Sequence, residues 1–330
     1  MLFSTLLFLV AIGVILGGAA VFTNGVEWLG RRLGFSDGAI GSILAGVATA
    51  LPETLIPVIA IFFGNSQAEA DIGTGAILGA PLMLSTLTIP LMAGFLLVLA
   101  GMQKRANHFT LDYHAVRLDL NFFLPAYAVA FLVALMPIPA LRYAAAAGLL
   151  LMYIWYVKIH LMSGDVSEIE LEPLYFSRTA GHPATAMIAT QAMAGLGLLV
   201  GGAHLFVHAV EDVALGMGVS PLLLSLIVAP VATELPEKMN SLLWIYQKKD
   251  TLAVGNITGA MVFQGTFPVS VGLLGTGWNL DQASLISLLL PIIATIFFLA
   301  QIHLAGKWSP RLLIFPAVLY VGYIAYIVIR

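Results

Sequence analysis

Two stretches of the chain carry nearly the same six residues: ATALPE at residues 48–53 and ATELPE at residues 232–237. The two stretches are 184 residues apart, and the same offset relates GGAAVFTNGVE at residues 17–27 to GGAHLFVHAVE at residues 201–211. Chance matches would not keep one offset over such separate segments. We therefore interpret the sequence as an internal duplication.

The composition places this duplication in a membrane. Of 330 residues, 60% are hydrophobic and 9% are charged, with a mean hydropathy of +0.99. A soluble domain has about 25% charged residues, so this chain lacks the polar residues that a water-exposed surface needs. The net charge of −3 gives no basic surface for nucleic acid, and the absence of cysteine excludes disulfides and cysteine-ligated zinc.

Apolar runs predict an all-α polytopic membrane protein with ten transmembrane helices. Their approximate ranges are 2–24, 36–63, 71–101, 118–137, 139–160, 185–209, 218–246, 251–275, 282–304 and 310–329. The polar stretch 162–184 lies between two groups of five helices. The predicted domains are thus a first repeat at 1–161, a cytoplasmic linker at 162–184 and a second repeat at 185–330.

Basic residues predict the orientation of these helices, because loops rich in Lys and Arg stay in the cytoplasm. Eleven lie in loops that follow odd-numbered helices: Arg31, Arg32, Lys104, Arg105, Arg117, Lys158, Arg178, Lys248, Lys249, Lys307 and Arg311. Only Arg142 and Arg330 lie on the other side. We expect a multi-pass protein of the cell membrane with both termini outside the cytoplasm.

The odd number of helices in each repeat inverts the second repeat in the membrane. Inverted-topology repeats are typical of secondary transporters, whose substrate sites lie near the midplane at interrupted helices. The duplication therefore indicates transport by alternating access. No glycine-rich phosphate loop is present in the sequence, so an ATP-driven pump is not indicated, and we expect a protein that is not an enzyme.

Each repeat carries a carboxylate directly after a proline in a predicted span: Glu53 and Glu237. Proline frees backbone carbonyls in the preceding turn, near Thr49 and Thr233. Carboxylate, hydroxyl and carbonyl oxygens are hard ligands that suit Ca²⁺ or Na⁺. A charged group at this depth marks an ion path, whereas the alternative is a pair of protonated glutamates that hydrogen-bond between helices.

The two motifs resemble the α-repeats of the cation/Ca²⁺ exchanger superfamily, which includes the sodium/calcium exchangers. The family pattern is GTSLPE, and the resemblance extends over ten helices, both repeats and nearly the whole chain. It implies that Thr49, Glu53, Thr233 and Glu237 bind the transported cation.

The chain departs from the family pattern at positions related to sodium. The family carries GSNxFN or GSNxFD in the helix after each motif, where this chain has GAPLML at residues 79–84 and GAMVFQ at residues 259–264. These two stretches are related by an offset of 180 residues. Both serines are alanine, and the last polar position is Leu84 in the first repeat but Gln264 in the second. The missing oxygens favour H⁺ over Na⁺ as the coupling ion.

Two charged residues stand in the second motif where the first repeat has none. Glu234 replaces the motif serine, and Lys238 follows Glu237 directly. Residues 234 and 238 are one helical turn apart, so an ion pair is reasonable. We add Glu234 and Gln264 to the predicted metal ligands. Alternatively, Lys238 is an internal surrogate cation, or its side chain extends toward the lipid headgroups.

Two further patterns occur in the duplicated first segments. His204 and His208 are four residues apart, with Glu211 and Asp212 one turn further. Helix-end packing is the favoured interpretation, and a regulatory or entry metal site is the alternative. The glycine pairs 17–18 and 201–202 predict close contact or sliding of the first and sixth helices.

These observations predict a secondary antiporter that exchanges Ca²⁺ for Na⁺ or H⁺ through a midplane carboxylate site. The alternatives are a Na⁺(K⁺)/H⁺ antiporter with Lys238 as internal charge and, from another class, a passive cation channel or a non-transporting membrane protein. We expect inorganic cations and the lipid bilayer as partners, with no cofactor, no nucleic acid and no required protein partner.

Overall fold

Helices are the regular elements throughout the residues that the computed structural model describes, which are 2–33, 50–136, 138–162, 172–177 and 183–329. Side chains of residues 235–238 are outside this description. The elements are α1 (Leu2–Arg32), α4 (Leu51–Phe62), α5 (Gln67–Met83), the π-helix η2 (Leu84–Thr88), α6 (Ile89–Gly101), α7 (Tyr113–Leu135), α8 (Pro139–Met162), α9 (Thr185–Met217), α10 (Pro221–Tyr246), α11 (Asp250–Gly275), α12 (Gln282–Ala305), α13 (Pro310–Leu313) and α14 (Pro316–Ile329).

Eight helical segments in the described residues are long and apolar enough to cross a membrane. Two shorter apolar helices cover Leu51–Phe62 and Pro221–Glu234. These shorter helices lie within the predicted second and seventh spans, where residues 34–49 are outside the description. The count of ten spans therefore stays a prediction, whereas the all-helical multi-pass architecture is observed.

The helices group into two compact units. Unit 1 contains residues 1–73 and 154–221, and unit 2 contains residues 74–153 and 222–330. Each unit combines segments from both predicted repeats. The division by contact thus differs in kind from the predicted division at 1–161, 162–184 and 185–330, which stays a prediction.

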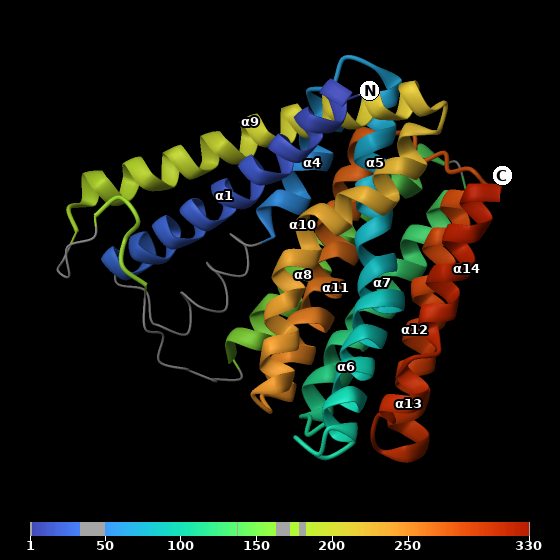
Figure 1. Cartoon of the computed structure of the whole chain (residues 1–330). Helices are drawn as coiled ribbons and strands as arrows, with labels where there is room; N and C mark the ends of the chain where they lie inside the picture. Colours follow the sequence, from blue (N-terminus) through green and yellow to red (C-terminus); the bar gives the residue numbers. More distant parts are fainter. Residues whose placement is uncertain (1, 34–49, 137, 163–171, 178–182, 330) are drawn as a thin grey trace. The chain divides into compact units, whose positions relative to one another are not determined.

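In unit 1, α1 and α9 lie side by side and run antiparallel (Figure 1). A Cβ added at Gly18 would lie 2.9 Å from Cβ of Leu198, and one added at Gly202 would lie 2.9 Å from Cγ1 of Ile15. The helices approach this closely because both positions lack a side chain. Adding 184 to 18 and 15 gives 202 and 199, so each contact nearly repeats under the offset found in the sequence.

The described part of the predicted linker is attached to this helix pair. The Asn24 side chain accepts a hydrogen bond from the Tyr175 backbone amide at 3.2 Å, and Gln191 Oε1 accepts one from the Phe176 amide at 2.8 Å. Gln191 also donates to Asn24 Oδ1 at 2.8 Å. These amide side chains satisfy backbone groups that would otherwise be buried without partners.

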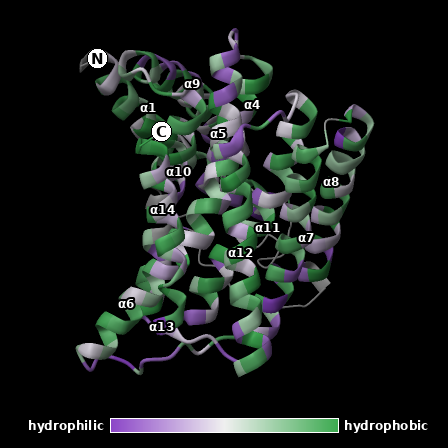
Figure 2. Cartoon of the chain, turned by 90° about the vertical axis from the view of Figure 1, so that its right-hand side faces the viewer, coloured by the Kyte–Doolittle hydropathy of each residue, from purple (hydrophilic) through white to green (hydrophobic). Residues whose placement is uncertain are grey.

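Unit 2 has an aromatic core around α7, α11 and α12. Phe123 and Tyr127 of α7 stack with their ring centroids 5.0 Å apart, and Phe298 of α12 contacts Trp308 at 5.4 Å. All four side chains are fully buried. Most of the helical ribbon carries hydrophobic colouring in Figure 2. Large apolar side chains on α8 and α14 are exposed, as expected for helices that face lipid.

The predicted span 71–101 is interrupted by the π-helix between α5 and α6. Pro81 and Pro90 flank this segment, and each removes one donor from the helical ladder. The Ser85 hydroxyl donates to the Pro81 carbonyl at 2.7 Å, and Thr86 donates to the Leu82 carbonyl. The π-helix begins at Leu84, so the regular α-helical register assumed from the sequence ends at that residue.

Candidate cation-binding site

The predicted ligands are divided between the two units. Glu53 lies on α4 in unit 1, and Thr233, Glu234 and Gln264 lie on α10 and α11 in unit 2. The backbone of Glu237 belongs to α10, but its side chain is outside the described part, as is all of Thr49. The convergence of Glu53 and Glu237 therefore stays a prediction.

Glu53 is positioned by the start of α4. The helix begins at Leu51, so Pro52 occupies the first turn, where a missing backbone donor costs little. Glu53 lies in the same turn and is 7% exposed. The positive end of the helix dipole favours a carboxylate there. Thr54 donates to the Ala50 carbonyl at 2.9 Å, which closes the turn.

The second motif lies inside a continuous helix. Pro236 is within α10, which runs from Pro221 to Tyr246. Thr233 is buried, and its hydroxyl donates to the Ala229 carbonyl at 3.1 Å. The two motifs therefore differ locally: the first proline begins a described helix, whereas the second is an interior residue.

Hydrogen bonds between side chains join α10 to α11. Gln264 Nε2 donates to Glu234 Oε1 at 2.9 Å, and both side chains are buried. Asn256 Nδ2 donates to Ser241 Oγ at 3.2 Å further along the same pair. Residue numbers rise on one helix as they fall on the other, so the helices are antiparallel. The contact brings together two of the predicted ligands, Glu234 and Gln264.

The donor set consists of hard oxygen groups in an apolar surrounding. Glu53, Thr233, Glu234 and Gln264 are the predicted ligands whose side chains are described, and all four are buried. A buried carboxylate is costly unless a cation, a proton or hydrogen bonds compensate its charge. Such groups suit a dehydrated alkali or alkaline-earth cation better than a thiophilic metal.

A further buried carboxylate was missed by the sequence analysis. Asp119 on α7 accepts a hydrogen bond from the Thr258 hydroxyl on α11, and both residues are buried. Asp119 is only two residues from Arg117, so in the sequence it is hard to distinguish from a solvated helix end. Its depth becomes evident only when α7 and α11 pack together.

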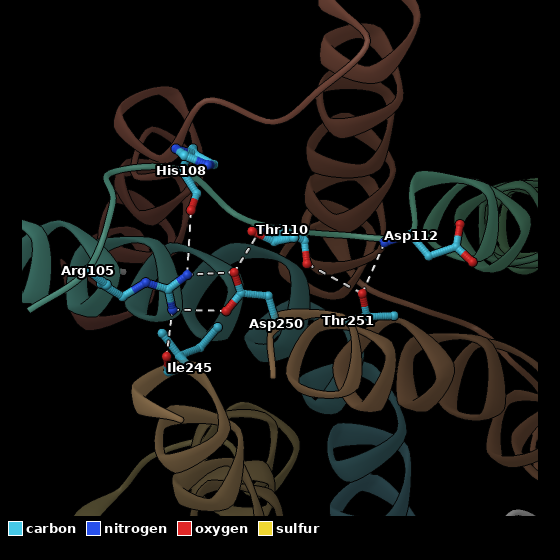
Figure 3. A network of polar contacts seen from close by, with 7 residues as sticks. All are labelled: Arg105, His108, Thr110, Asp112, Ile245, Asp250 and Thr251. Atoms are coloured by element: carbon cyan, nitrogen blue, oxygen red, sulfur yellow. Dashed lines mark hydrogen bonds and ion pairs between the residues drawn. The ribbon is translucent and has the colours of Figure 1, made fainter. Parts of the chain in front are cut away.

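A second missed network fixes the ends of helices in unit 2 (Figure 3). The Arg105 guanidinium contacts both oxygens of Asp250, at 2.9 and 2.6 Å, and donates to the Ile245 carbonyl. The Thr110 amide donates to the same carboxylate at 2.8 Å. Charge bias alone accounted for Arg105 in the sequence, whereas the structure gives it a buried partner at the start of α11.

The two histidines of α9 have different surroundings. His204 Nδ1 lies 3.0 Å from the Val200 carbonyl one turn earlier. His208 Nδ1 lies 3.0 Å from Glu69 Oε1 on α5. The metal-type cluster within the described residues contains Glu69, His208 and Glu211, so His204 is not part of it.

Comparison with known proteins places the chain in a family of membrane exchangers. Residues 3–162 and 188–330 match the family described as sodium/calcium exchanger protein, and the chain belongs to this family. The relative "Putative antiporter CaxA" of Alkalimonas amylolytica is 26% identical over 300 residues, covering 86% of this chain and 84% of that protein.

Two solved structures share the fold. The H⁺/Ca²⁺ exchanger CAX has a TM-score of 0.74 at 16% identity, covering 99% of this chain and 86% of CAX. The sodium-calcium exchanger NCX_Mj has a TM-score of 0.59 at 21% identity, covering 98% of this chain and 97% of NCX_Mj. The sequence-based family prediction is thereby confirmed.

Proposed function

We propose that this protein is a secondary antiporter that exchanges Ca²⁺ for Na⁺ or H⁺ by alternating access. Glu53 and Glu237 are the main ligands, and Thr49, Thr233, Glu234 and Gln264 supply further oxygens. The observation that carries the proposal is the burial of all four proposed ligands whose side chains are described, in a member of the sodium/calcium exchanger family.

Contacts between predicted loops support the proposed topology. If the chain crosses the membrane ten times, loops after odd-numbered helices lie on one side and loops after even-numbered helices on the other. Four contacts each join loops of one class: Trp28 with Glu172, Arg105 with Asp250 and Tyr113 with Trp308 after odd-numbered helices, and Ser66 with Glu211 after even-numbered ones. With the bias of basic residues, this supports termini outside the cytoplasm.

Local chemistry favours H⁺ as the coupling ion. Ala80 is buried, and Leu84 is fully buried at the start of the π-helix, so the first repeat presents no side-chain oxygen at these two positions. Ala260 lacks the oxygen in the second repeat. A site with few neutral oxygens and several carboxylates suits protons, which compete with Ca²⁺ for the same groups.

The test is uptake of ⁴⁵Ca²⁺ into proteoliposomes with Na⁺ and H⁺ gradients imposed separately. We expect uptake that depends on a counter-ion gradient and is driven more strongly by H⁺ than by Na⁺. Uptake that is indifferent to both gradients would indicate a channel. Uptake driven by Na⁺ with a flat pH profile would contradict the H⁺ coupling while leaving the antiporter intact.

A further inference from the structure

A cluster of metal-ligating side chains lies in unit 1, apart from every residue proposed to bind the transported ion. It comprises Glu69 from the first turn of α5, and His208 and Glu211 from α9. One possible ligand atom from each residue lies within 4.8 Å of the other two. His208 and Glu211 are three residues apart, so they share one face of α9.

Glu69 is held in place by the local fold. Ser66 and Glu69 form a capping box at the start of α5: Ser66 Oγ accepts from the Glu69 amide at 3.1 Å, and Glu69 Oε2 accepts from the Asn65 amide. A Cβ at Gly64 would lie 2.9 Å from the same carboxylate oxygen, so glycine keeps the loop close to it. Oε2 is thus engaged locally, and Oε1 is directed toward His208.

The contact between the helices already has nearly the spacing of two metal ligands. His208 Nδ1 and Glu69 Oε1 are 3.0 Å apart. In a tetrahedral zinc site with bonds near 2.0 Å, two ligand atoms lie about 3.3 Å apart. A metal ion could therefore replace this contact with little movement of either helix.

The third ligand is oriented by the same loop. Ser66 Oγ donates to Glu211 Oε1 at 2.9 Å, which holds the Glu211 side chain next to the capping box. The Glu69 side chain is 4% exposed and that of His208 is 54% exposed, so the cluster is open to solvent on one side and fixed on the other. Two carboxylates this close repel unless a cation compensates them.

We propose that Glu69, His208 and Glu211 bind a divalent transition-metal ion of the Zn²⁺ type, with water completing the coordination. One imidazole and two carboxylates suit Zn²⁺, whereas Ca²⁺ prefers an all-oxygen shell. The ion would join the α4–α5 loop to α9. The site does not depend on the proposed transport mechanism, because none of its residues belongs to the proposed transport ligands.

The test is Zn²⁺ binding to the purified, untagged full-length chain in detergent, by isothermal titration calorimetry with excess Ca²⁺ present. His208→Ala removes an exposed side chain and should weaken Zn²⁺ binding by about tenfold or more. Glu211→Gln should also weaken it. His204→Ala, one turn away on the same helix, is the matched control and should bind as the wild type does.

Glu53→Gln separates this site from the proposed transport site and should keep Zn²⁺ affinity unchanged. Zn²⁺ should raise the apparent Tm of the wild type but not of His208→Ala, because a ligand stabilises only the state that binds it. Equal binding by the wild type and His208→Ala would overturn the proposal and leave His208 and Glu69 as an ion pair. Loss of binding in Glu53→Gln would also overturn it.

Discussion

Gln264 and Glu234 form a buried amide–carboxylate hydrogen bond of 2.9 Å between α11 and α10. Their equivalents in the first predicted repeat, by the offsets of 180 and 184 residues, are Leu84 and Ala50. Both partners are thus polar in one repeat and both apolar in the other. A buried hydrogen bond requires this, because either partner alone would lose its compensation. We infer that the two repeats contribute unequal sets of oxygens to the proposed site.

The Glu234–Gln264 pair makes a prediction about coupling. Gln264→Leu takes a donor away from a buried carboxylate and should destabilise the protein by about 1–3 kcal/mol. The double variant Glu234→Ala, Gln264→Leu copies the first repeat and should regain much of this stability. Thermal unfolding of the purified variants measures both effects. Strictly additive changes from Glu234→Ala and Gln264→Leu would show that the pair is not energetically coupled.

The motif carboxylates should be essential for exchange. Glu53→Gln and Glu237→Gln each remove a negative charge from a dehydrated site, where charge–charge attraction is far stronger than in water. Each should abolish ⁴⁵Ca²⁺ exchange in proteoliposomes while the protein retains a monodisperse profile on size exclusion. Asp212→Asn, an exposed carboxylate on α9, is the control and should transport normally. Wild-type rates in both glutamate variants would mean that the site lies elsewhere.

Local patterns in the sequence were sufficient to predict the helices and the family, but they could not predict side-chain partners. Glu234 was expected to pair with Lys238 on its own helix, whereas the structure shows Gln264 as its partner on α11. The Lys238 pair stays a prediction, because that side chain is outside the described part. Helical spacing reveals neighbours within one helix, but the opposing residue depends on how two helices pack.

The same reason explains the missed ionic contacts. Arg105 and Asp250 are 145 residues apart, and both lie in loops that look ordinary in sequence. The four-residue spacing of His204 and His208 suggested a metal-type pair, yet the structure replaces His204 with Glu69 from α5. A capping-box pattern at residues 66–69 was present in the sequence and was the available signal for Glu69.

The buried Arg105–Asp250 pair should matter for stability more than its loop position suggests. The Arg105 and Asp250 side chains are 6% and 0% exposed, so Arg105→Ala leaves an uncompensated carboxylate at the start of α11. We expect a loss of about 3–5 kcal/mol. Arg105→Lys should recover only part of it, because lysine cannot make the two-pronged contact. Thermal unfolding measures the loss, and Lys104→Ala, at the exposed neighbouring residue, is the control. A similar Tm for all three variants would refute this expectation.

The α1–α9 contact distinguishes the two members of each glycine pair. Gly18 and Gly202 face the partner helix, and a Cβ at either position would approach it to 2.9 Å. Gly17 and Gly201 have no heavy atom within 4 Å of such a Cβ. The sequence identified both pairs as contact glycines but could not tell which residue of each pair faces the neighbouring helix. The structure therefore predicts effects of opposite sign within each pair.

Alanine substitutions test this difference directly. Gly18→Ala and Gly202→Ala should lower thermal stability, because overpacking against the opposing helix costs about 1–3 kcal/mol. Gly17→Ala and Gly201→Ala should raise it slightly, since alanine in an open helical position is favoured over glycine by about 0.5–1 kcal/mol. If these helices also slide during exchange, the first two variants should slow ⁴⁵Ca²⁺ uptake while the second two leave it unchanged. The same sign for all four changes in Tm would mean that α1 and α9 do not pack through Gly18 and Gly202.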